Sequence, residues 1–192
     1  MDALLATPGL TAIADREAAY RQHVLDSLSA VDAIARSGGP IVDVGSGGGA
    51  PGIPLAAAFP DREVTLLEAV GRKCEFLRRA AGAFANVRVV HGRAEEQETD
   101  AWGVAVAKAL AEPPVAAEWC LPLVRPGGTI VLYVAADADA ARVSIVASRV
   151  GGGAAEVVPV SDTRALLVIP KVEPTPAGFP RRPGLARKRP LA

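Results

Sequence analysis

The sequence predicts an α/β fold in which helices cover both faces of a doubly wound, mostly parallel sheet of seven strands. The first observation is that short apolar runs alternate with helical repeats between residues 41 and 149. Strands that alternate with helices usually pair in parallel. The second is that 192 residues with a hydrophobic content of 50% suit one domain with a sizeable core.

The first element is an expected helix over residues 16–35, where Ala19, Val24, Leu28, Val31 and Ile34 recur at helical spacing. A Ser-Gly-Gly-Pro run at residues 37–40 ends it. Apolar runs bounded by glycine, proline or polar residues predict the strands, at residues 41–44, 64–67, 87–90, 104–107, 129–134, 156–160 and 165–169. The helices expected between them are residues 55–59, 72–84, 115–123 and 137–149.

The last two expected strands are separated by only four residues, 161–164. A connection this short suits a hairpin, so this terminal pair is expected to be antiparallel. Residues 174–190 are dense in proline and glycine and are expected to have no regular structure. We therefore expect a domain over residues 1–171 and a basic tail over residues 172–192.

Charge is balanced over the whole chain, with 21 basic and 21 acidic residues, but it is uneven along it. Residues 171–192 hold six basic side chains and one acid, so this end carries +5 and the remainder −5. A basic end suggests a polyanionic partner, and a solvated, disordered terminus explains the charge equally well.

Several classes of protein are disfavoured by the sequence. The start of the chain has no basic leader followed by an apolar stretch, and no apolar run reaches the roughly 18 residues of a membrane span. Cys74 and Cys120 lie far apart without a CxxC motif or a histidine cluster, so we expect buried thiols, no disulfide and no metal site. A cytoplasmic protein without membrane contact is the expectation.

The turn after the first strand is unusually rich in glycine, with five glycines between residues 45 and 52. Glycine permits positive φ and a close approach of the backbone to a ligand. Nucleotide-binding α/β folds place an acid at the end of the second strand, where it accepts hydrogen bonds from ribose hydroxyls. Glu68 holds that position, and the ordered combination of strand, loop, helix, strand and acid favours a nucleoside site over a solvated loop.

The nucleoside could belong to NAD, because residues 45–50 also satisfy the GxGxxA spacing. Asp43 disfavours this, because its carboxylate would face a pyrophosphate but could accept a hydrogen bond from a methionine ammonium. Pro51 and Pro54 remove N–H donors from the helix start that would bind the phosphates. Together with the Pro-Gly-Gly turn at residues 126–128, these features resemble class I S-adenosylmethionine (SAM)-dependent methyltransferases, which have a Rossmann-like fold.

Four segments make the resemblance more specific. They are the RQHVLDSL run at residues 21–28, the DVGSG…PGIPL run at residues 43–55, the VHGRAEE run at residues 90–96, and the basic end that closes in Pro190-Leu191. Together they are similar to the 16S ribosomal RNA guanine-N7 methyltransferases, a family also called glucose-inhibited division protein B. The resemblance implies methyl transfer from SAM to N7 of a guanine in 16S rRNA, with the rRNA or the small ribosomal subunit as partner and a monomeric enzyme.

The resemblance also implies roles for individual residues. The implied cofactor-binding residues are Gly45, Ser46, Gly47, Ala50, Glu68 as the ribose acceptor, Ala94 and Glu95 beside the adenine, and Lys108 after the fourth strand. His23, Asp26 and Ser27 share one helical face, which the resemblance places beside the active site. His23, Asp26 and Lys108 are therefore candidate positioning residues, with local hydrogen bonding on a helix surface as the alternative.

The chain departs from the family pattern in three places. Lys108 stands where the family typically has arginine, the lysine-glycine pair after the fifth strand is absent, and the segment before Leu10 is short. A lysine keeps the charge but loses the planar fork of a guanidinium. These departures motivate an alternative function, a catalytically weakened relative that acts as an RNA-binding or ribosome assembly factor.

Guanine N7 carries a lone pair and no proton, so methylation there needs no general base. Positioning alone can supply about 7 to 11 kcal/mol in well-oriented reactions. Methylation of pyrimidine C5 would need a cysteine nucleophile after a proline, and neither cysteine has that context. Enzymes that methylate exocyclic amines commonly carry Asn or Asp followed by Pro-Pro-aromatic, which Glu112-Pro113-Pro114-Val115 matches only in part.

Overall fold

The computed structural model describes residues 2–192 and contains the seven expected strands in one sheet. Each strand begins and ends within a few residues of its predicted bounds, and the fifth begins earliest relative to its prediction because residues 124–128 also extend along the sheet. The strands are β1 (Ile41–Val44), β2 (Val64–Glu68), β3 (Val87–His91), β4 (Trp102–Lys108), β5 (Val124–Ala135), β6 (Glu156–Ser161) and β7 (Arg164–Pro170).

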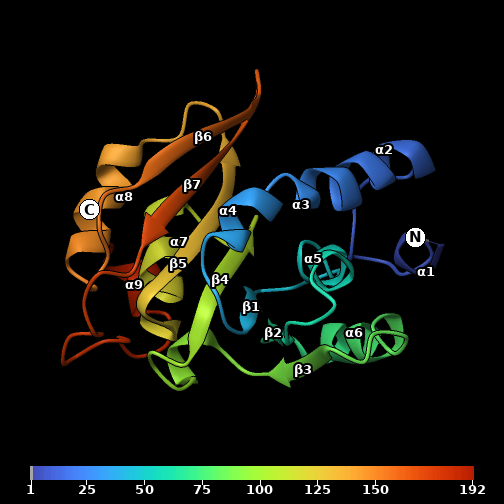
Figure 1. Ribbon diagram of the computed structural model, residues 1–192. Helices are drawn as coiled ribbons and strands as arrows, with labels where there is room; N and C mark the ends of the chain where they lie inside the picture. Colours follow the sequence, from blue (N-terminus) through green and yellow to red (C-terminus); the bar gives the residue numbers. More distant parts are fainter. Residues whose placement is uncertain (1) are drawn as a thin grey trace.

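The strand order is β3-β2-β1-β4-β5-β7-β6 (Figure 1). The first five strands pair in parallel, whereas β7 pairs antiparallel with both β5 and β6. The doubly wound sheet and its terminal antiparallel hairpin are thus confirmed. The order reverses at β1, between β2 and β4, and this is the switch point at which ligands bind in open α/β sheets.

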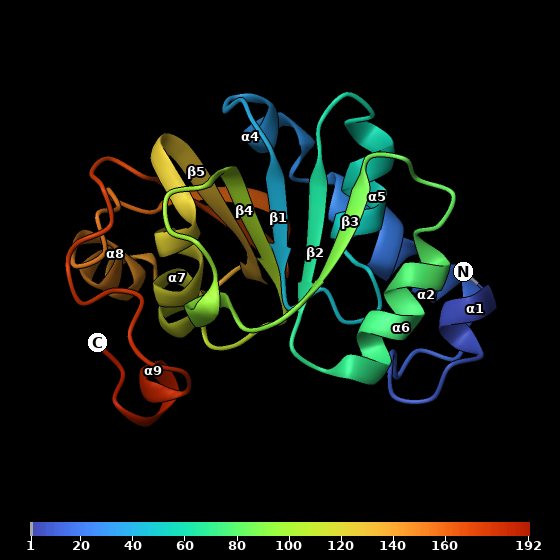
Figure 2. The same cartoon turned by 90° about the horizontal axis from the view of Figure 1, so that it is seen from below.

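Helices cover both faces of the sheet. One core cluster joins one face to α7 and α8, and a second joins the opposite face to α4, α5 and α6. Figure 2 shows α7 and α8 near β4 and β5, and α6 beside β3. The helices are α1 (Asp2–Leu5), α2 (Arg16–Tyr20), α3 (Asp26–Leu28), α4 (Val31–Ala35), α5 (Gly52–Ala58), α6 (Gly71–Ala80), α7 (Pro113–Cys120), α8 (Ala140–Ser148) and α9 (Leu185–Lys188).

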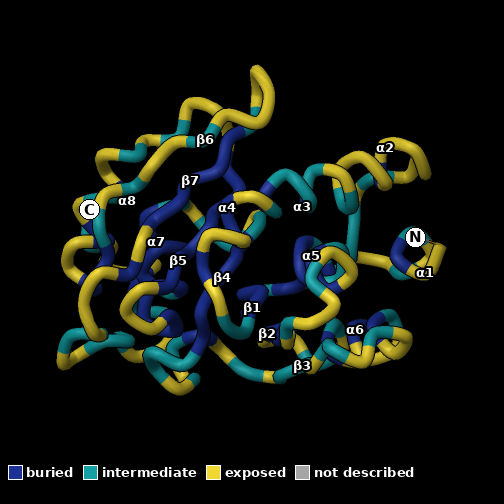
Figure 3. The backbone as a smooth tube through the Cα atoms, in the orientation of Figure 1, coloured by how far each residue is buried: buried dark blue, intermediate teal, exposed yellow. Residues whose placement is uncertain are grey.

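The central strands are buried along their length and the edges are not. Every residue of β1 and β2 is buried, as are most residues of β4, β5 and β7, whereas β6 is almost wholly exposed (Figure 3). Pro159, which lacks an N–H donor, lies in this edge strand beside an irregularity in the pairing of β6 with β7, where proline is tolerated.

The prediction of one continuous helix over residues 16–35 is wrong in detail. The segment is helical in pieces: α2, a π-helical turn η1 (Arg21–Leu25), α3, and, after a turn at Ser29 and Ala30, α4. A π turn inserts an extra residue and shifts the faces that follow. Apolar spacing alone cannot reveal such an insertion.

The prediction that residues 174–190 lack regular structure is also wrong, because α9 forms a short helical turn there. The segment is anchored by Lys171, whose buried Nζ donates to the carbonyl oxygens of Leu121 and Val150 and to Thr175 Oγ1 at 3.0, 3.1 and 2.7 Å. Charge counting places Lys171 among solvated cations, and the structure instead uses it as a buried hydrogen-bond donor. Both cysteines are free and buried, as expected.

Within residues 2–192 no helix combines the length and the apolar character that a membrane crossing requires. The same residues contain no group of three or more His, Cys, Asp or Glu side chains placed to hold a metal ion.

Candidate functional site

The glycine-rich loop after β1 is held by close backbone packing. Gly45 has φ +74°, and a Cβ atom there would overlap Leu110 Cδ1. Gly52 opens α5 directly against Asp43, where a Cβ would lie 2.7 Å from Asp43 Oδ2. Glycine is required at both positions. At Gly45 the positive φ and the contact with Leu110 both exclude a side chain, whereas at Gly52 close contact alone does so.

Asp43 lies beneath this loop. Its Oδ2 accepts a hydrogen bond from the Gly52 N–H at 3.0 Å, while Oδ1 is buried without a hydrogen-bond partner among residues 2–192. Burial raises the pKa of Asp43 to about 7. The carboxyl group thus ties the loop to the first turn of α5, and no partner neutralises its charge.

Glu68 ends β2 and faces the loop from the neighbouring strand. Its Oε2 accepts from the Gly47 N–H at 3.0 Å, and its Oε1 accepts from the Val70 N–H at 2.8 Å. Glu68 as a whole is 6% exposed. The acid predicted at the end of the second strand therefore orders two loops at the carboxyl edge of the sheet.

A cavity of about 450 Å³ opens at this edge. The loops after β1, β2, β3 and β4 form its walls, so it occupies the switch point. Four of the residues predicted from sequence lie in its lining, namely Gly45, Glu68, Ala94 and Glu95. Ser46 and Gly47 lie in the same loop; Ser46 is buried and its hydroxyl donates to the Asp43 carbonyl at 2.9 Å.

Ala50 does not line the 450 Å³ cavity. It lines a second cavity of about 330 Å³, together with His23, Ile53 and apolar side chains of α1 and α6. The structure therefore separates Ala50 from Glu68 and Glu95, although all three fall within the same expected site.

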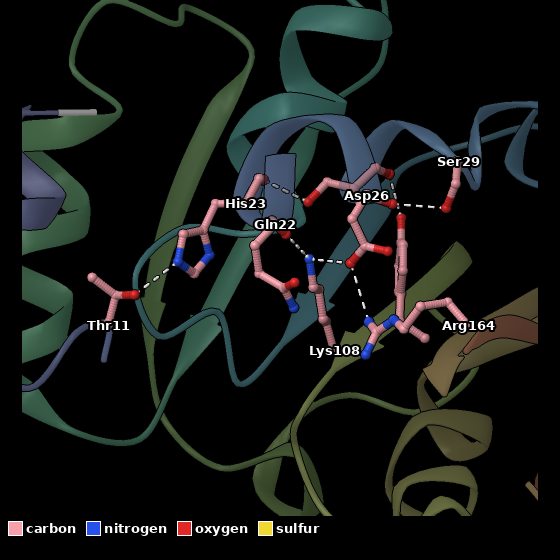
Figure 4. A network of polar contacts seen from close by, with 9 residues as sticks. Thr11, Gln22, His23, Asp26, Ser29, Lys108 and Arg164 are labelled. Atoms are coloured by element: carbon pink, nitrogen blue, oxygen red, sulfur yellow. Dashed lines mark hydrogen bonds and ion pairs between the residues drawn. The ribbon is translucent and has the colours of Figure 1, made fainter. Parts of the chain in front are cut away.

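Lys108, at the end of β4, belongs to a polar network outside the 450 Å³ cavity. Its Nζ lies 2.5 Å from Asp26 Oδ2 and also donates to the carbonyl oxygen of Gln22, and Arg164 Nη2 contacts the same Asp26 oxygen at 3.1 Å (Figure 4). Burial lowers the pKa of Lys108, and the Asp26 carboxylate opposes that shift. Asp26 thus joins the N-terminal helices to β4 and β7.

His23 and Ser27 make local contacts. His23 Nε2 lies 3.0 Å from Thr11 Oγ1, and the Ser27 hydroxyl donates to the His23 carbonyl at 2.8 Å. Burial, followed by the Lys108 charge, lowers the pKa of His23. The Tyr133 hydroxyl donates to the Ser27 carbonyl at 2.5 Å, which ties α3 to β5.

Sequence reasoning misses several residues of the 450 Å³ cavity. Lys73, Leu110, Trp119, Gly184 and Arg187 line it, although none of them is among the site residues predicted from sequence. Gly184 and Arg187 come from the tail, far from the other lining residues in sequence. The sequence signals of a role for the tail are its basic charge and its similarity to the basic end of the family.

Comparison with known proteins identifies the family. The family model for rRNA small subunit methyltransferase G matches residues 5–150. Relatives named ribosomal RNA small subunit methyltransferase G are 38% identical in Chloroflexus aggregans and 36% identical in Alkaliphilus metalliredigens. Each alignment covers 95% of this chain and 82% of the relative.

Solved structures match the fold. A 16S rRNA N2 methyltransferase from T. thermophilus, in complex with AdoMet and guanosine, has a TM-score of 0.57 and 18% identity over 72% of this chain and 36% of its own. The precorrin-6y C5,15-methyltransferase of Geobacter metallireducens has a TM-score of 0.61 and 15% identity over 88% of this chain and 95% of its own. The fold is that of class I methyltransferases, and the extent of the sequence match shows that this chain belongs to the rRNA small subunit methyltransferase G family.

Proposed function

We propose that the protein transfers a methyl group from SAM to N7 of a guanine in 16S rRNA. The observation that carries this proposal is the cavity at the switch point, which is lined by Gly45, Glu68, Ala94 and Glu95. Its volume of about 450 Å³ lies in the range of small-molecule and cofactor sites. Family membership favours SAM over NAD as the nucleoside ligand.

Within the cavity, Glu68 would accept hydrogen bonds from the ribose hydroxyls, and Ala94 and Glu95 would flank the adenine. We assign Gly45, Ser46 and Gly47 to the loop that approaches the cofactor, and we keep Ala50 and Lys108 as cofactor-binding candidates at its methionine end. His23 and Asp26 complete the assignment as positioning residues, since Asp26 fixes Lys108 beside the end of β4.

A neighbouring cavity of about 300 Å³ is suited to the acceptor base. It shares Ala109 and Leu110 with the cofactor cavity, and the carboxylates Glu112 and Asp137 stand among its lining residues. Enzymes read an extruded base through its Watson–Crick edge, and in guanine that edge offers N1–H and N2–H donors, for which carboxylates are matching acceptors. N7 lies on the adjacent Hoogsteen edge, which contacts to N1–H and N2–H leave free to face the methyl donor.

The reaction moves the methyl group from the sulfonium to the N7 lone pair. The C–S electron pair stays on sulfur, and no proton leaves N7, so the chain's residues need only hold the two groups in line. A free ionised base in the cofactor cavity is not required. Asp43, with its pKa near 7, lies under the loop and supports its shape.

The remaining assignments concern the setting of the enzyme. We propose the small ribosomal subunit or its RNA as substrate, the cytoplasm as compartment, and a monomer as the acting unit. We further propose that residues 1–171 form the methyltransferase domain, with residues 172–192 as a basic extension that packs against it.

Calorimetry with SAM and S-adenosylhomocysteine tests the pocket, with Gly45→Asp as the matched variant that blocks it. Micromolar binding by the wild type, lost in the variant, supports the cofactor site. Incubation of small subunits with labelled SAM, followed by mapping of 7-methylguanine, then tests the reaction. Cofactor binding without turnover on subunits or free 16S rRNA would favour the alternative of an RNA-binding or assembly factor.

A further inference from the structure

We infer that residues 181–189 form a fixed wall of the cofactor cavity and that Arg187 contributes to the affinity for adenine nucleosides. The inference rests on the proposed binding of SAM in that cavity. It assigns a ligand-binding role to a segment whose charge alone suggested contact with RNA.

A buried ion pair holds the segment in place. Arg181 Nε and Nη2 donate to the two carboxylate oxygens of Glu118 at 2.6 Å each, and the two side chains are 17% and 3% exposed. Paired bonds of this kind are short and directional, and a buried carboxylate left without its cation is strongly destabilising. Arg181 Nη2 also donates to the Arg189 carbonyl at 3.0 Å, which closes the segment on itself.

Between Arg181 and Arg189 the segment bridges two loops that line the cavity. The Gly184 N–H donates to Glu95 Oε1 at 3.0 Å, on the loop after β3. Arg187 Nη2 donates to the Leu110 carbonyl at 3.1 Å, on the loop after β4. Both Gly184 and Arg187 line the cavity, so the tail closes the side between these loops.

Trp119 completes this wall. The Arg187 guanidinium lies 5.1 Å from the centroid of the Trp119 ring, within the distance of a favourable cation–π contact. Trp119 also lines the cavity, and its Nε1 is buried without a hydrogen-bond partner among residues 2–192. A flat, partly cationic wall beside Glu95 suits the electron-rich face of a purine.

The location of this wall predicts which part of the cofactor it contacts. Glu95 is the residue that we assign beside the adenine, and its carboxylate is oriented by Gly184. Loss of the wall should therefore weaken ligands that contain adenosine, whether or not they carry the amino acid portion of SAM.

Calorimetry with S-adenosylhomocysteine and with 5′-methylthioadenosine tests this on the full chain. Arg187→Gln should weaken both ligands by about tenfold, which corresponds to one charge-assisted hydrogen bond. Arg149→Gln, which replaces an exposed arginine that does not line the cavity, should change neither affinity by more than about twofold. Arg181→Gln should weaken both ligands and lower the melting temperature.

Arg187→Gln still tests the inference if Arg181→Gln fails to fold. Arg187 is exposed, and its replacement leaves the ion pair between Arg181 and Glu118 intact. Unchanged nucleoside affinity in Arg187→Gln would overturn the inference, and so would a loss of rRNA affinity alone. If the wild type itself bound neither ligand, the proposed function would fail as well. Binding by the wild type that persists in Arg187→Gln would reject only the role of the tail.

Discussion

Lys108 Nζ lies 2.5 Å from Asp26 Oδ2, and the side chains of the two residues are 7% and 14% exposed. This pair joins the end of β4 to the helical segment that precedes the sheet. Arg164 of β7 approaches the same oxygen, so three distant parts of the chain meet at one carboxylate. The helical segment is thereby fixed relative to the carboxyl edge of the sheet.

Replacement of Lys108 by methionine should lower the free energy of unfolding by about 2 to 3 kcal/mol, because it leaves Asp26 shielded from water with Arg164 as its remaining cation. Asp26→Asn removes the carboxylate that Lys108 and Arg164 share, so it should cost at least as much, and the double variant should be more stable than the sum of the single losses predicts. Urea denaturation of the four proteins gives the coupling energy. Strict additivity would show that the pair contributes nothing to stability.

Gly45→Ala should reduce SAM affinity more than Gly47→Ala does. Both glycines have positive φ, +74° and +54°, so the backbone strain of the substitution is similar. At Gly45, however, the added methyl group overlaps Leu110, whereas at Gly47 its nearest neighbour is 3.7 Å away. Calorimetry should show a difference of about tenfold or more. Equal losses would mean that backbone conformation, and not the contact with Leu110, limits binding.

The stability of the fold should depend on pH through Asp43. Its pKa is raised to about 7 by burial, so between the ordinary carboxyl range and pH 7 the folded protein holds a proton that the unfolded chain has released. The contribution of Asp43 to the free energy of unfolding therefore falls as the pH rises through that window and is constant above it. Asp43→Asn cannot ionise, and its stability should fall less steeply between pH 5 and pH 7.

Urea midpoints measured across this range for the wild type and Asp43→Asn provide the check. Other titrating groups are common to both proteins, so only the difference between the two curves reports on Asp43. Parallel curves would show that Asp43 ionises at an ordinary pKa in the folded protein.

The sequence predicts the sheet well because its signals are local. Each strand is a short apolar run between turn residues, and Glu68 follows the glycine loop at the spacing of a nucleoside site. The π-helical turn Arg21–Leu25 is different, since an inserted residue leaves the apolar pattern of residues 16–35 nearly intact. The prediction of one continuous helix is therefore wrong in its continuity, although the helical segment begins and ends at the predicted residues.

Contacts across the fold also escape local patterns. Lys171 looks like the first cation of a solvated tail, yet it is buried and bonded to two carbonyl oxygens. Arg187 reaches Leu110, 77 positions earlier, only because the tail returns to the carboxyl edge of the sheet. Charge counting shows that a segment is basic, whereas only packing shows which of its charges are already in use.

This division of the basic residues makes the last prediction specific. Lys171 and Arg181 are bonded within the fold, whereas Arg182, Lys188 and Arg189 are exposed and their side chains make no ion pair with the described part of the chain. If these three bind phosphates, replacing all of them by glutamine should reduce the slope of log affinity for rRNA against log salt by about 2. Nucleoside binding should stay unchanged, because within residues 181–189 only Gly184 and Arg187 line the cavity. Filter binding across a salt series measures the slope, and an unaltered slope would mean that the RNA contacts lie elsewhere on the protein.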